Sequence, residues 1–339
     1  MNRNELYYRK TVGAIGATML LFLLLINLVG IIYEILPDIL SILLPTSSVV
    51  IACQTVYAAG YLLAFMLPVL LLKGLIGKAG YVYQPMQSSL VLTPWIFLMI
   101  PATVTVIFSA AYLNTAMVDI FNYSDFLWDM LEVTDEPLPV YRWVLEFIVM
   151  CVVPGFCEEF LFRGAIQTNL RPFGRVNAVM ISSLLFALMH QNAGQILYAF
   201  VAGIFLGVIY EKTQSIWFTT ILHVFNNFIS VFESMIANKV QTMFESDLYQ
   251  LLFEAILLAL GVLSLVVLIM KHGSGKPDLH GGVFGKQIQA AEGYAACPIA
   301  PRRAVKLFLT PTMVIFLVMC TLQIFFLVLL SLGYGLYEL

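Results

Sequence analysis

Apolar residues fill most of this chain in long blocks, and short polar or charged segments separate the blocks. A helix needs about 20 apolar residues to cross a bilayer, and most of the blocks have at least that length. Three central blocks are shorter, which suggests helices buried among other helices. The nine predicted spans are Thr11–Leu36, Val49–Leu72, Leu90–Leu113, Val140–Phe162, Asn177–His190, Ile196–Tyr210, Ile216–Phe232, Leu251–Met270 and Lys306–Leu332. The pattern therefore predicts an all-α, polytopic transmembrane helical bundle.

Composition supports this prediction. Of 339 residues, 61% are hydrophobic and 11% are charged, and the mean hydropathy is +0.92. Soluble domains carry about 25% charged residues, so a soluble protein is excluded. We expect the partners to be the lipid bilayer and a peptide or membrane protein, with no nucleic acid; the oligomeric state is left open.

The placement of Lys and Arg predicts how the chain is oriented. When the nine spans are drawn, 14 of these residues fall in the loops on the N-terminal side and 2 on the other side. Cytoplasmic loops carry an excess of Lys and Arg. We therefore expect an integral protein of the cytoplasmic (plasma) membrane of a bacterium, with a cytoplasmic N-terminus and an external C-terminus.

Ionisable residues inside the predicted spans are few, and such residues indicate function by default. Cys157-Glu158-Glu159-Phe160-Leu161-Phe162-Arg163 holds three of them. On a helix Glu159 and Arg163 are four residues apart and share a face, in the favourable order for an ion pair. Glu158 points about 100° away. The spacing thus predicts a structural pair, and it allows Glu158 to face a cavity as a carboxylate of the kind that a general base requires. The alternative is a helix end at the cytoplasmic interface, with all three groups solvated.

Two histidines follow in the next spans. His190 ends an apolar run that contains Phe186, and by itself it fits an interfacial residue as well as a functional one. His223 and Asn227 are four residues apart, so one helix face presents an imidazole and an amide. That pair could also serve as an interhelical hydrogen bond for packing.

Together these residues resemble a known family. Glu-Glu-x-x-x-Arg (158–163), Phe-x-x-x-His (186–190) and His-x-x-x-Asn (223–227) are similar, in order, to the motifs of the CPBP family. This family contains CAAX prenyl endopeptidases and bacteriocin-processing, Abi-like proteins. The resemblance covers about residues 140–235.

The resemblance implies an intramembrane endopeptidase (a hydrolase) whose active site lies in a conical intramembrane cavity. Glu158 would activate a water, His190 would position it, and His223 with Asn227 would form an oxyanion hole. Glu159, Arg163 and Phe186 would support the site. No cofactor is favoured and no metal is required. Zinc is the alternative, with Glu158, His190 and His223 as ligands, a set of the type found in zinc enzymes.

The substrate and two other functions stay open. The resemblance implies a membrane-associated peptide, either a prenylated CAAX-type sequence or a leader. A non-proteolytic immunity or scaffold protein that binds a partner at the same cluster is one alternative, and a proton-coupled transporter is another. We expect N-terminal helices and an acidic outer loop at 1–139, the catalytic core at 140–235, an additional span at 236–271, a flexible cytoplasmic loop at 272–305 and a peripheral span at 306–339.

Overall fold

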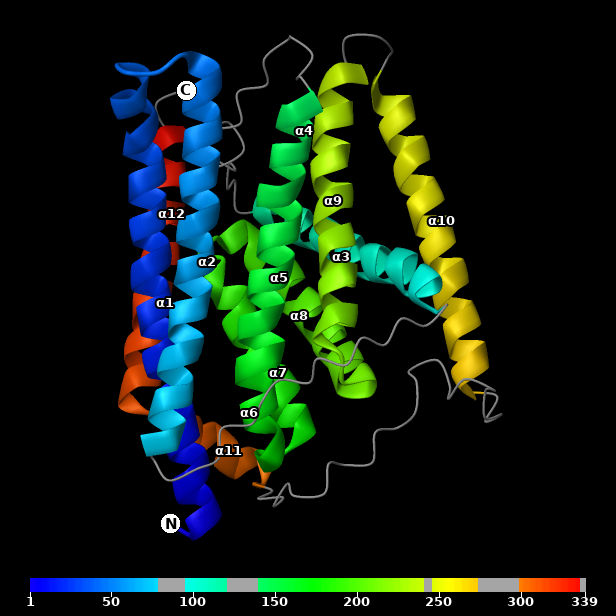
Figure 1. Cartoon of the computed structure of the whole chain (residues 1–339). Helices are drawn as coiled ribbons and strands as arrows, with labels where there is room; N and C mark the ends of the chain where they lie inside the picture. The colour runs from blue at the N-terminus through cyan, green and yellow to red at the C-terminus, as the bar shows by residue number, and fades with distance from the viewer. Residues whose placement is uncertain (79–94, 121–139, 241–245, 274–298, 336–339) are drawn as a thin grey trace. The chain divides into compact units, whose positions relative to one another are not determined.

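The computed structural model describes residues 1–78, 95–120, 140–240, 246–273 and 299–335, and every regular element in these ranges is a helix (Figure 1). This confirms the predicted all-α fold. Within the described ranges, five helices are long and apolar enough to cross a membrane, and three further apolar helices are shorter. The protein is therefore an integral membrane protein built from helices, and the count of nine spans stays a prediction.

The chain divides into two compact units, and each is described by itself. The first comprises Met1–Met86, Leu138–Ile181 and Gly293–Met319. The second comprises Gln87–Pro137, Ser182–Glu292 and Cys320–Leu339. Glu158 and its neighbours belong to the first unit, whereas His190 and His223 belong to the second.

A hairpin of two long helices forms much of the first unit. Helices α1 (Arg3–Ser41) and α2 (Thr46–Lys78) lie side by side (Figure 1). A capping box starts α1: the Asn2 side chain accepts from the Glu5 N–H, and the Glu5 carboxylate accepts from the Asn2 N–H. The buried face of α1 follows the helical period, with Tyr8, Val12, Ile15, Met19, Phe22 and Leu23.

The fourth predicted span continues beyond Phe162 as one winding helical segment. It comprises α4 (Val140–Glu146), η1 (Phe147–Val152), α5 (Val153–Glu159), η2 (Phe160–Gln167), α6 (Thr168–Leu170) and η3 (Arg171–Phe173). Both η1 and η2 have π-helical hydrogen bonding. Pro154 has no N–H to donate to the preceding turn, which explains a widened turn at η1. Helix α5 packs against α2, and Glu158 at its end faces that helix.

Four helices make up most of the second unit: α3 (Ile96–Ile120), α8 (Ala193–Thr213), α9 (Ile216–Val240) and α10 (Ser246–Gly273). Helix α7 (Arg175–Met189) enters this unit at Ser182. Helix α3 packs against α8, α9 and α10 around an apolar core. The buried residues of that core are Ile96, Met99, Ala102, Leu206, Ile209, Phe218, Leu222 and Leu268.

Glycine allows α7 and α8 to approach closely. A Cβ atom at Gly203 would lie 2.9 Å from the Ser183 Cα atom, closer than real Cβ contacts. The two backbones therefore touch at this point, as in small-residue contacts between membrane helices. This contact fixes α8 against the part of α7 that carries His190.

Several predicted boundaries were wrong. The sixth and seventh spans are longer than their apolar cores, because α8 begins at an Asn192 N-cap and runs to Thr213, and α9 continues to Val240. The last span begins at Pro311, not Lys306: Leu309 leaves the helical conformation, and the Thr310 hydroxyl caps the new helix by accepting from the Met313 N–H at 3.4 Å.

The C-terminal region thus contains two helices, α11 (Pro301–Phe308) and α12 (Pro311–Gly335). Helix α11 occupies the end of the segment expected to be a flexible loop. The rest of that loop (274–298) and most of the acidic outer loop (121–139) lie outside the described residues, so what was predicted there stays a prediction.

Candidate active site

Glu158 lies at the end of α5 and is buried, with 5% of its surface exposed. It is buried there because α5 packs against α2. A carboxyl group in such surroundings needs hydrogen-bond partners. The structure supplies one from a distant part of the chain.

That partner is Tyr61, on α2. Its hydroxyl donates a 2.7 Å hydrogen bond to Glu158 Oε1, across 97 positions of sequence. Stacking holds the Tyr61 ring, because its centroid lies 4.7 Å from that of Phe65, which in turn packs edge-on against Phe22 of α1. The hairpin therefore fixes the direction of this hydrogen bond, and with it one oxygen of the carboxylate.

Nothing in the sequence pointed to Tyr61. Its only signal is an aromatic series on one helix face, Tyr57, Tyr61 and Phe65, which fits ordinary packing equally well. The link to Glu158 depends on how two separate helices pack. A single sequence does not predict a tertiary contact of this kind.

Glu159 and Arg163 form the ion pair that their spacing predicts. Arg163 Nη1 lies 2.9 Å from Glu159 Oε1, and the two side chains are 1% and 0% exposed. The pair lies where α5 passes into the π-helical η2. Such π-helical turns are frequent at functional sites. Glu159 is thus paired with Arg163, and Glu158 accepts a hydrogen bond from Tyr61. The cavity that Glu158 was expected to face stays a prediction.

His190 caps the C-terminal end of α7. Its Nδ1 atom lies 2.9 Å from the Phe186 carbonyl oxygen, one of the last carbonyls of the helix. A carbonyl only accepts, so Nδ1 carries the proton and donates. In the neutral ring, Nε2 then has the lone pair. The chain turns sharply just after it, with Gln191 in the left-handed region (φ 55°) and Asn192 capping α8.

Phe186 connects the two histidines of the second unit. Its ring centroid lies 5.1 Å from that of His190 and 5.8 Å from that of His223, both in edge-to-face arrangements. His223 is buried on α9. Phe186 thus contacts both imidazoles, and the supporting role that the resemblance implies for it stays a prediction.

The buried polar residues of α9 include Thr220 and Asn226 as well as His223. Asn227 follows His223 by one turn and is partly buried. Thr220 and Asn226 precede and follow His223 by three residues, and each has a buried oxygen with no hydrogen-bond partner in the part of the chain that is described. Ordered water commonly satisfies such atoms. These polar residues around His223 are therefore suited to hold water.

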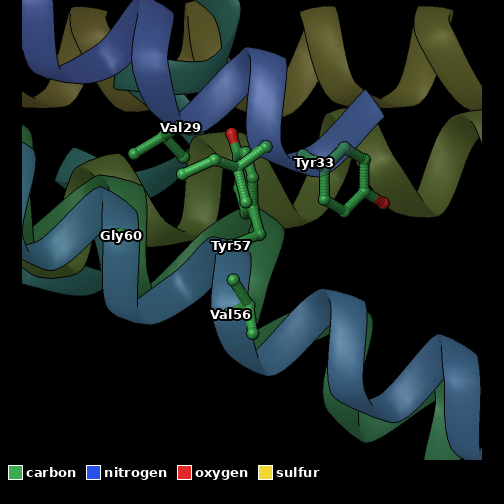
Figure 2. Close-up of a pocket in the computed structure, with 6 residues that line it drawn as sticks. Val29, Tyr33, Val56, Tyr57 and Gly60 are labelled. Carbon is green, nitrogen blue, oxygen red and sulfur yellow. The ribbon is translucent and has the colours of Figure 1, made fainter. Parts of the chain in front are cut away.

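A small pocket between α1 and α2 lies beside this chemistry but is apolar. Figure 2 shows Tyr57 projecting between Val29 and Tyr33 of α1 and the turn of α2 that contains Gly60. All of the exposed surface in this pocket is apolar. None of the candidate catalytic residues lines it.

The predicted residues thus form two groups. Glu158, Glu159 and Arg163 are together in the first unit, where Tyr61, which the sequence did not indicate, joins them. Phe186, His190 and His223 are together in the second, with Asn227 one turn away. In the described residues no three His, Cys, Asp or Glu side chains are grouped so as to hold a metal ion. The conical cavity expected for the family remains a prediction.

The helices and the buried polar groups define a class of protein. It is a polytopic membrane protein whose helices carry candidate catalytic residues for hydrolysis. Residues 140–229 match a family model described as "Rce1-like: Type II CAAX prenyl endopeptidase Rce1-like". This segment contains both groups of candidate residues except Tyr61. No curated protein and no solved structure matches the chain.

The match confirms the resemblance to the CPBP family that the three motifs predicted. It supports intramembrane endopeptidase activity in general, and therefore a hydrolase that acts on peptides or membrane-associated substrates within a lipid bilayer. About three quarters of the chain lies outside the matched segment.

Proposed function

We propose that this protein is an intramembrane endopeptidase that cleaves peptide bonds by means of a water activated by Glu158. The observation that carries the proposal is a buried carboxylate, inside the matched segment, whose Oε1 atom is held by the Tyr61 hydroxyl at 2.7 Å. A carboxylate fixed by one oxygen can direct the other toward a water. Geometry of this kind is the first requirement for a general base.

In the proposed reaction Glu158 removes a proton from the water while the water oxygen attacks the scissile carbonyl carbon. The tetrahedral intermediate has a negative oxygen, to which His223 and Asn227 donate hydrogen bonds. One well-placed donor of this type contributes about 3–4 kcal/mol. When the C–N bond breaks, Glu158 returns its proton to the leaving amine, so atoms and charge balance.

His190 has the protonation pattern for a water-positioning role. With Nδ1–H donating to the Phe186 carbonyl, Nε2 can accept a hydrogen bond from the attacking water. Phe186 and the tight turn after Met189 fix the ring. We propose that Glu159 and Arg163 act structurally, by holding α5 and η2 in the register that presents Glu158.

Zinc chemistry is the alternative on the same residues. Glu158, His190 and His223 would be the ligands, and the Nδ1–H donation of His190 to a backbone carbonyl is the outer-shell arrangement that zinc-bound histidines use. A bound zinc would polarise the carbonyl and activate the water. The residue types suit either mechanism, although the described residues group no three such side chains around a metal ion, and removal of metal distinguishes the two.

The substrate class that we propose is a membrane-associated peptide, of the prenylated CAAX type or a leader. The experiment is cleavage of matched prenylated and unmodified peptides by the full chain in nanodiscs. Glu158→Gln should abolish cleavage, and Glu146→Gln, which alters a glutamate paired with Arg142 on the same helical segment, should not. Equal loss in both variants, or full activity in Glu158→Gln, would refute the proposed base.

A further inference from the structure

Helix α11 lies outside the segment that matches the family and has two chemically distinct faces. Ala304 and Leu307 are buried, whereas Arg302, Val305, Lys306 and Leu309 are exposed. Arg302, Val305 and Lys306 are spaced by three and four positions and form one helix face, and Leu309 directly follows the last residue of the helix. We name these four residues the outer face of α11.

Three contacts fix how α11 is rotated. Before the helix, the Ile299 N–H donates to the Phe173 carbonyl at 3.2 Å. Within it, Arg303 Nε and Nη2 donate to the two oxygens of Glu5 at 2.8 and 3.2 Å. The helix therefore lies against the first turns of α1 (Figure 1), and its outer face cannot turn inward without breaking these bonds.

The position of α11 is tied to a membrane span. Helix α12, which is long and apolar enough to cross a bilayer, begins only three residues after α11 ends. Its first turn is fastened to α1, because the Thr312 hydroxyl donates to the Gly13 carbonyl at 2.7 Å and Gly16 leaves room for the Met313 backbone. A helix this close to the start of a span lies at the membrane surface.

The outer face has the composition of a surface that meets lipid headgroups. It combines two cations with two large apolar side chains, Val305 at 70% and Leu309 at 58% exposure. In a purely aqueous environment the exposure of these apolar side chains would be unfavourable, and a soluble anion would bind the cations without contacting them. At an interface the apolar side chains enter the acyl boundary, and the cations remain among the phosphates.

We propose that the outer face of α11 binds the headgroups of anionic phospholipids. Helix α11 has three cationic residues and no acidic residue, and one of those cations, Arg303, is engaged by Glu5. Arg302 and Lys306 point outward. Basic clusters next to a membrane span attract anionic lipid, with an energy near the surface that corresponds to about a fivefold change in affinity per cation.

The test is native mass spectrometry of the full chain with added phosphatidylglycerol or phosphatidylcholine of equal chain length. The variant Arg302→Gln/Lys306→Gln removes the two outward charges. The matched control, Lys73→Gln/Lys78→Gln, removes two exposed charges from the end of α2 in the same unit. Glycerophosphoglycerol serves as a soluble competitor that has the headgroup without acyl chains.

We expect wild type to prefer phosphatidylglycerol, the outer-face variant to lose roughly 25-fold in its affinity for this lipid, and the control to lose less than threefold. Phosphatidylcholine binding should be unchanged throughout, and the soluble competitor should not displace the lipid. An equal loss in both double variants would show general charge attraction and overturn the proposal. So would an absence of preference for the anionic lipid, or displacement by the competitor.

Discussion

The two adjacent glutamates provide a sharp test, because the structure gives them different partners. Glu159 and Arg163 are 0% and 1% exposed and paired at 2.9 Å, whereas Glu158 accepts from Tyr61. Arg163→Met takes the guanidinium away from a buried carboxylate. Removing one partner of a buried pair costs about 3–5 kcal/mol, mostly because a charge is left without its counter-charge.

Replacing both partners should cost much less than replacing one. The double variant Glu159→Gln/Arg163→Met leaves neither member of the pair charged, and neutral replacements of buried pairs are often tolerated. We therefore expect it to recover most of the stability that Arg163→Met loses. Glu158→Gln keeps the shape of the side chain and should change stability by less than about 1 kcal/mol while it abolishes cleavage.

The assay is the free energy of unfolding of each purified variant, from titration of mixed micelles with SDS, measured beside peptide cleavage. The reasoning would be refuted by a loss below about 1 kcal/mol in Arg163→Met, or by a double variant as unstable as the single one. An active Glu158→Gln variant would show that the roles of the two glutamates are assigned wrongly.

Two further predictions concern single contacts. Tyr61→Phe removes only the hydroxyl that positions the catalytic carboxylate, and since a hydrogen bond to a charged group contributes about 1.5–3 kcal/mol, kcat should fall roughly 10- to 100-fold with KM changed less than about threefold. Tyr57→Phe, one turn away, should leave both constants unchanged; a matching loss there, or a change only in KM, would contradict the positioning role. Gly203→Ala should destabilise the protein by about 1–3 kcal/mol in the same SDS titration, because the new methyl would lie 2.9 Å from the Ser183 backbone. Gly74→Ala, at a helical glycine with nothing within 4 Å, should not, and equal effects would show that backbone approach is unimportant.

Much of the fold follows from local rules and was accessible to prediction. Blocks of apolar residues must form helices in a bilayer, because backbone groups have no other partners there. Within the described residues, seven of the nine predicted blocks overlap one helix each, whereas Val140–Phe162 falls in a series of short helical elements and Lys306–Leu332 includes the end of α11 as well as α12. Spacing also predicted the ion pair of Glu159 and Arg163, because residues four apart on a helix meet without help from the rest of the chain.

Errors arose where capping, and not hydropathy, sets the boundary. The Asn192 side chain starts α8 before its apolar core, and the Thr310 hydroxyl starts α12 after a break that the apolar run concealed. The same run concealed α11, whose helical pattern is too short to stand out. These boundaries depend on single hydrogen bonds, and the mean hydropathy of a stretch of sequence does not indicate them.

Of the site, the residue types were predictable and one long-range partner was not. Glu158, His190 and His223 stand out because ionisable groups are rare in apolar helices. Tyr61 does not stand out, because an aromatic residue on α2 is ordinary and its contact with Glu158 spans 97 positions. The roles predicted for His190, His223 and Asn227 depend on where they lie relative to Glu158, and these remain proposals.

The central claim is a peptide bond cleaved by a water that Glu158 activates. The most direct measurement is cleavage of a peptide library by the purified full chain, wild type and Glu158→Ala, each with and without a strong chelator. The proposed mechanism predicts internal cleavage by wild type that survives chelation and is absent in Glu158→Ala at either condition. Cleavage that chelation abolishes and added zinc restores would contradict the metal-free mechanism, and cleavage that persists in Glu158→Ala would contradict the central claim itself.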